Sequence, residues 1–143
     1  MGTVRDTLWS RVDPSPATAI LALGDLTAIV GFVVIGAVGA HGRSLSDVVG
    51  LFETAIPFVV GWGLAALLGS LYTVDARRSA LRAVSWTVPA WVTAALIAQI
   101  LRALLPSPDS FSFVFLAVSI GAGLALLAPW RAAMGYRLSG RSV

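Results

Sequence analysis

The first long apolar stretch of the chain, residues 17–40, reads ATAILALGDLTAIVGFVVIGAVGA. A helix of about 20 residues, rising 1.5 Å per residue, crosses a hydrocarbon core of about 30 Å, so this stretch is long enough to span a membrane. Three more stretches of similar character follow at residues 52–73, 83–105 and 111–130. We therefore predict an all-α integral membrane protein, a bundle of four transmembrane helices.

The composition agrees with a chain that is embedded in lipid. Of its 143 residues, 57% are hydrophobic and 12% are charged, whereas soluble domains carry about a quarter charged residues. We predict a cytoplasmic segment at 1–16, either an interfacial helix or a frayed tail, a four-span domain at 17–131 and a cytoplasmic tail at 132–143. A cleaved signal peptide is disfavoured, because the first apolar run exceeds roughly 7–15 residues and Asp25 interrupts it.

The basic residues predict the orientation in the membrane. All ten are arginines, and eight of them fall on one side of a four-span topology: Arg5, Arg11, Arg77, Arg78, Arg82, Arg131, Arg137 and Arg141. Arg43 and Arg102 fall on the other side. By the positive-inside rule, both termini are expected in the cytoplasm, with the protein in the plasma membrane.

Several classes of function lack support in the sequence. There is no cysteine and one histidine, whereas a structural zinc site takes four ligands, so we expect no metal and no cofactor. No complete nucleotide-binding or nucleophile motif is present, and we expect no enzymatic activity. The arginines form no basic run, which argues against nucleic acid. The expected partner is the lipid bilayer, and a homo-oligomer or a complex with other membrane proteins is left open.

Asp25 is the first candidate for a functional residue. It lies about eight positions into the first span, and an ionised carboxylate inside the hydrocarbon is costly, so it should face the interior of the bundle. One interpretation is a site that binds a proton or a cation. The other is a buried carboxyl that fixes the packing of the helices. The residues around Asp25 do not decide between the two.

A second group of candidates gathers at the outer ends of the spans: His41, Arg43, Glu53 and Arg102, with Gln99 one helical turn before Arg102. They could line an anion site or the mouth of a pathway. The alternative, which we favour, is that they are ordinary charges at helix ends that extend to water or form an ion pair.

Tryptophans and small residues predict how the helices pack. Trp62, Trp86 and Trp91 lie within the second and third stretches, where they could line an apolar ligand pocket or fill the core. Small residues recur at four-residue spacing, which lets helix backbones approach closely. Packing within one bundle is the favoured interpretation, and a dimer interface is the alternative.

Several short motifs resemble a known family. They are Asp25 in the first span, Ala40-His41-Gly42, Thr54-Ala55-Ile56-Pro57-Phe58 with Gly61-Trp62, Trp91-Val92-Thr93 leading to Arg102, and Pro129-Trp130-Arg131. Over residues 19–131 the chain resembles the prokaryotic four-span membrane family filed as domain of unknown function 3054. The resemblance implies a prokaryotic source and marks six family-type positions: Asp25, His41, Pro57, Phe58, Arg102 and Arg131. It implies no reaction.

Two functional hypotheses follow. The first is a transporter or channel for a small solute or ion that uses the intramembrane Asp25. The second is an accessory or structural membrane subunit that binds a larger complex, a lipid or an apolar pigment. The short connections and the missing catalytic motifs fit both.

Overall fold

A computed structural model gives the fold, and it describes residues 10–40, 42–105 and 112–139. Its main elements are four long helices: α2 (Pro16–Ile35), α3 (Val48–Leu68), α4 (Ala80–Leu104) and α5 (Phe113–Ser139). A π-helical turn, η1 (Gly36–Ala40), extends α2, and a short 3₁₀ helix, η2 (Asp75–Arg77), lies between α3 and α4. In the described ranges an isolated β-bridge between Val12 and Tyr72 is the one extended pairing.

The four helices are long and apolar enough to cross a membrane, which confirms the predicted all-α, four-span fold. Large apolar side chains also cover their outward faces, as a helix in contact with lipid requires. Leu23 of α2 and Val114 of α5 are 65% and 75% exposed. His41 and the outermost terminal residues lie outside the described part of the chain.

The helix ends follow local chemistry, and two of them differ from the expected spans in ways that affect the site. Helix α3 ends at Leu68, five residues before the predicted Thr73, because Gly69 closes it and Ser70 takes a left-handed conformation with φ of 57°. Helix α5 continues to Ser139, well past Trp130. Both shifts matter for the site, because they bring Tyr72 and Arg131 into the bundle.

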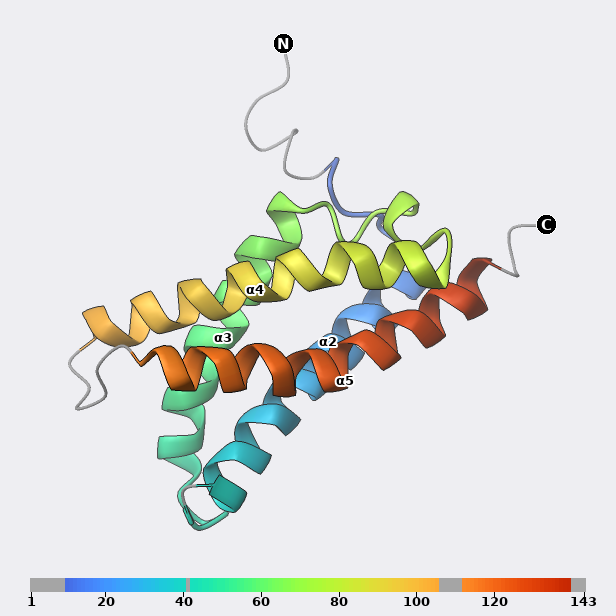
Figure 1. Cartoon of the computed structure of the whole chain (residues 1–143). Helices are drawn as coiled ribbons and strands as arrows, with labels where there is room; N and C mark the ends of the chain where they lie inside the picture. The colour runs from blue at the N-terminus through green and yellow to red at the C-terminus, as the bar shows by residue number, and fades with distance from the viewer. Residues whose placement is uncertain (1–9, 41, 106–111, 140–143) are drawn as a thin grey trace.

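The helices form two antiparallel hairpins that cross (Figure 1). Helices α4 and α5 run side by side, and α2 and α3 cross behind them. The start of α2, the 69–79 connection and the end of α5 lie together, and we call this the terminal end of the bundle. We call the opposite end the hairpin end. There the α2–α3 turn lies apart from the end of α4 and the start of α5 (Figure 1).

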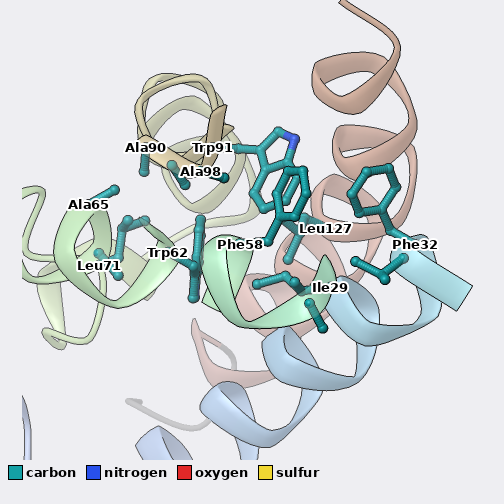
Figure 2. Packing of buried hydrophobic residues seen from close by; sticks show 14 residues of the cluster. Ile29, Phe32, Phe58, Trp62, Ala65, Leu71, Ala90, Trp91, Ala98 and Leu127 are labelled. Carbon is teal, nitrogen blue, oxygen red and sulfur yellow. The ribbon is translucent and has the colours of Figure 1, made fainter. Parts of the chain in front are cut away.

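Close backbone contact holds α3 against α4. A Cβ atom at Gly61 would lie 2.5 Å from the carbonyl oxygen of Ala94, so only glycine permits this approach. Beside this contact lies an aromatic core (Figure 2). The Phe58 ring stacks on Trp91 at 6.0 Å between centroids, and the Phe32 ring meets Phe58 edge-on at 5.2 Å. The core therefore joins α2, α3 and α4 through rings rather than through polar groups.

Candidate functional site

Asp25 lies in the interior of the bundle, as the sequence predicts, and its side chain is completely buried. Its partner is Arg131 of α5, which is 1% exposed. The Arg131 Nε donates to Asp25 Oδ1 at 3.0 Å and Nη2 donates to Oδ2 at 2.5 Å, a two-pronged geometry that fits a guanidinium to a carboxylate. The two residues lie at similar depth, nine residues after Pro16 and eight before Ser139, or roughly 12–14 Å along their helices.

The connection after α3 completes the network. The Tyr72 hydroxyl donates to Asp25 Oδ2 at 2.7 Å and accepts a hydrogen bond from Trp62 Nε1 at 2.9 Å. The Arg131 Nη1 donates to the Leu71 carbonyl at 3.1 Å. Burial, and then the negative charge of Asp25, raises the pKa of the Tyr72 hydroxyl well above its ordinary value, which keeps the hydroxyl protonated as a donor. We call Asp25, Arg131, Tyr72 and Trp62 the Asp25 network.

Aromatic rings surround the guanidinium on the sides that hydrogen bonds leave open. The Cζ of Arg131 lies 5.5 Å from the centroid of Trp62 and 5.1 Å from that of Tyr72. Cation–π attraction strengthens when the cation is desolvated, as it is here. The charge of Arg131 is therefore compensated by a carboxylate, a carbonyl and two ring faces.

Helices α2 and α5 approach closely at this point. A Cβ atom at Gly24 would lie 1.9 Å from the Trp130 ring, so the glycine leaves the space that the indole fills. Trp130 Nε1 points toward the Leu21 carbonyl at 3.4 Å. Two pairs of consecutive residues therefore make adjacent contacts between α2 and α5: Gly24 packs against Trp130, and Asp25 forms an ion pair with Arg131.

A second polar network lies nearer the terminal end, and we call it the Arg77 network. It comprises Asp13, Ser15, Thr18 and Arg77. Arg77 is 8% exposed, forms an ion pair with Asp13 and donates to Thr18 Oγ1 at 3.0 Å. The Ser15 hydroxyl, followed by Arg77, lowers the pKa of the Asp13 carboxyl below its ordinary value of 3.8. Asp13 N also donates to the Tyr72 carbonyl at 2.7 Å, which links the two networks.

The hairpin end is arranged differently. Arg43 is exposed and donates to Thr54 Oγ1 at 3.3 Å. Arg102 places its Cζ 4.5 Å over the ring of Phe115. Glu53 is exposed on α3, and within the described residues no ion pair joins it to Arg102. Arg43 and Glu53 flank the start of α3, whereas Arg102 lies in the last turn of α4. These two helix ends lie apart (Figure 1), so the described members of the predicted outer cluster do not converge on one site.

The tryptophans and Gln99 occupy the core. Trp62 and Trp91 are 2% and 0% exposed, and their ring centroids are 6.2 Å apart (Figure 2). Trp86 packs at the edge of the same core, with Arg82 over its ring at 5.7 Å. Gln99 is buried in α4, and its amide nitrogen has no hydrogen-bond partner. Trp62 and Trp91 therefore lie in the core, and Trp86 packs against it.

Sequence reasoning missed the partners of Asp25. Arg131 was counted among the loop charges, because the apolar stretch ends one residue earlier, at Trp130. Tyr72 falls at the end of the second apolar stretch, 52–73, a position that predicts a ring at the membrane interface rather than in the interior. A buried acid requires a compensating cation, and Arg131 directly follows the fourth apolar stretch, so the signal was present although it was not specific.

The described part of the chain contains no group of three His, Cys, Asp or Glu side chains placed to hold a metal ion. A family model described as "Protein of unknown function (DUF3054)" matches residues 22–134, a range that contains both Asp25 and Arg131. No curated protein and no solved structure matches the chain.

Proposed function

The chain belongs to the DUF3054 family of membrane proteins, and from this premise we propose that it is a small transporter or channel whose terminal end is closed by the Asp25 network. The observation that supports the proposal is the ion pair between Asp25 and Arg131, which is wholly buried within apolar spanning helices. Ionisable residues at such depth are costly and commonly line pathways for ions or substrates. We propose no catalytic activity.

The network can act as a gate because it joins three elements of the terminal end. Asp25 belongs to α2, Arg131 to α5 and Tyr72 to the connection after α3. A proton that binds the Asp25 carboxylate removes the charge that holds Arg131. The guanidinium then loses its strongest partner, and α2, α5 and the connection are free to separate.

Proton flux tests this proposal. Vesicles containing the wild-type protein should dissipate an imposed pH gradient, reported by an entrapped pH-sensitive dye, faster than empty vesicles. Asp25→Asn should abolish the difference, because the neutral amide cannot exchange a proton. Asp47→Asn is the matched control, since Asp47 is exposed and only caps α3 at the hairpin end. Flux that is equal in wild type and Asp25→Asn would remove the proposal.

The expected orientation remains part of the proposal. The arginine distribution supports a cytoplasmic location for both termini, with the hairpin end outside. The prokaryotic source rests on the family resemblance. The absence of cysteine makes this testable with single introduced cysteines. A membrane-impermeant maleimide added to intact cells should label Ser46→Cys and leave Ser139→Cys unlabelled. The opposite pattern would invert the topology.

The second candidate is an accessory or structural membrane subunit. Its supporting observation is that each oxygen of Asp25 already accepts a hydrogen bond, so the pair can serve as a fixed contact between helices. Purification in a gentle detergent should then recover a stoichiometric partner, a homo-oligomer, a lipid or an apolar pigment. Recovery of the bare monomer alone, together with proton flux, would favour the transporter.

A further inference from the structure

The segment that leads into α2, residues 10–15, crosses the 69–79 connection, and we call it the strap. Val12 of the strap pairs with Tyr72 in the parallel β-bridge. The Asp13 backbone N–H donates to the Tyr72 carbonyl at 2.7 Å. Tyr72 is also the residue whose hydroxyl donates to Asp25. The strap therefore holds the backbone of a residue whose side chain completes the Asp25 network.

Two arginines hold the strap on either side of this backbone contact. Arg11 Nη1 donates at 2.8 Å to the carbonyl of Leu68 at the end of α3, where helix carbonyls lack partners within the helix. Arg77 of the connection forms an ion pair with Asp13. Because Leu68 precedes Tyr72 and Arg77 follows it, the strap is bound to the chain on both sides of Tyr72.

The ion pair of the strap is closer to water than the ion pair of the Asp25 network. The Asp13 side chain is 25% exposed. The Asp25 side chain is 0% exposed. A partly exposed ion pair is screened by water and costs less to separate than a buried one. Opening of the terminal end is therefore expected to begin at the strap, before Asp25 and Arg131 separate.

We propose that the strap, held by the ion pair between Asp13 and Arg77, positions the Tyr72 hydroxyl in the Asp25 network and moves first when the terminal end opens. When the ion pair separates, the backbone of Tyr72 loses its support, and the hydroxyl withdraws from Asp25. Asp25 then loses one of its donors and becomes accessible to water from the terminal end. The role in opening rests on the proposed transport function, whereas the positioning of Tyr72 does not.

The indole N–H of Trp62 gives a direct measurement of the Tyr72 position. It donates to the Tyr72 hydroxyl at 2.9 Å, so its signal in a ¹⁵N-correlated NMR spectrum of the protein in detergent depends on that hydroxyl. The Trp91 indole donates to the Ser119 carbonyl between α4 and α5 and serves as the control in the same spectrum. Trp62→Phe and Trp91→Phe assign the two signals. Asp13→Ala should shift the Trp62 signal and leave the Trp91 signal in place.

Three further variants separate positioning from a general loss of stability. Asp13→Glu keeps the carboxylate and should retain the wild-type Trp62 signal. Asp47→Ala removes an exposed carboxylate that caps α3 at the hairpin end, so it lowers stability without touching the strap and should also retain the signal. Arg11→Gln weakens the contact of the strap with α3 and should shift the signal in the same direction as Asp13→Ala does. Arg11→Gln also provides the test if Asp13→Ala does not fold.

Proton flux into vesicles tests the role of the strap in opening. Asp13→Ala should raise the flux by about three- to tenfold over the wild type, because the energy that holds the strap in place falls. The double variant Asp13→Ala/Asp25→Asn should show no flux above that of empty vesicles, since the route still depends on Asp25. Asp47→Ala should conduct as the wild type does.

An unchanged Trp62 signal in both Asp13→Ala and Arg11→Gln would overturn the inference, and so would equal shifts of the Trp62 and Trp91 signals. A shift of the Trp62 signal alone, without flux in any variant, would retain the positioning role and remove transport. Wild-type flux that depends on Asp25 and is not raised by Asp13→Ala would retain transport and remove the strap as the moving part.

Discussion

The two ends of this bundle differ in whether their buried polar groups have hydrogen-bond partners. At the terminal end, Asp25, Arg131 and Tyr72 all find partners inside the protein. At the hairpin end, the Gln99 amide nitrogen is buried without one. Because the hydrocarbon of a bilayer offers no substitute for a missing hydrogen bond, the paired network stabilises the bundle, whereas the unpaired donor costs the folded state its desolvation energy.

The largest effect is expected from breaking the terminal-end ion pair. Arg131→Met leaves the buried charge of Asp25 without its cation and should lower the free energy of unfolding by about 3–5 kcal/mol, measured in bicelles. Arg43→Met removes an exposed arginine at the hairpin end and should change it by no more than about 0.5 kcal/mol. Equal losses in the two variants would contradict the contrast between the ends.

The next largest difference in stability is expected between substitutions at two glycines of α2, Gly24 and Gly31. Gly24→Ala places a methyl group against the Trp130 ring and should cost about 1–3 kcal/mol of unfolding free energy. Gly31→Ala, further toward the hairpin end, meets open space and should gain up to about 1 kcal/mol from helix propensity. Thermal unfolding of both variants in one detergent gives the comparison. A stable Gly24→Ala variant would show that α2 and α5 do not need this close approach.

Removing a paired polar group and removing an unpaired one should change the free energy of unfolding in opposite directions. Tyr72→Phe deletes the donor to Asp25 and leaves Trp62 Nε1 without its acceptor, so it should lower the free energy of unfolding by about 1–3 kcal/mol. Gln99→Leu removes an unmet donor and should leave the free energy of unfolding unchanged or raise it. A loss in Gln99→Leu as large as that in Tyr72→Phe would show that the amide is already paired within the protein.

The smallest effect concerns the pH dependence of the Arg77 network. The pKa of Asp13 is lowered in the folded protein, so its contribution to stability is present above the ordinary value of 3.8 and is lost as the pH falls through the lowered pKa. Unfolding followed from pH 6 to pH 2 should therefore show a stability gap between wild type and Asp13→Asn that narrows below about pH 4. A gap that stays constant over this range would exclude the ion pair as its cause.

The sequence was sufficient for the fold and for the inward position of Asp25. Apolar length alone predicts four spans, and the cost of a carboxylate in lipid predicts that Asp25 faces the interior. The polar end groups were harder to interpret. Glu53 lies near the start of α3 and Arg102 near the end of α4. These helix ends lie apart because the two hairpins cross, and no local sequence pattern reports that crossing (Figure 1).

The partners of Asp25 could not be predicted, for reasons that are physical. Arg131 lies 106 residues away, so the contact depends on how α2 and α5 pack rather than on any periodicity. Tyr72 turns inward because α3 stops at Leu68 and the chain reverses at Ser70. A count of apolar residues extends the span to Thr73 and directs the same ring to the membrane surface instead.

The most direct test of the central claim is a double-mutant cycle on Asp25 and Arg131. The free energy of unfolding is measured in bicelles for wild type, Asp25→Leu, Arg131→Met and the double variant. If the pair holds the terminal end together, each single variant is strongly destabilised, the double variant recovers much of the loss, and the coupling energy is about 2 kcal/mol or more. Single-variant losses that add to within about 0.5 kcal/mol would contradict the account.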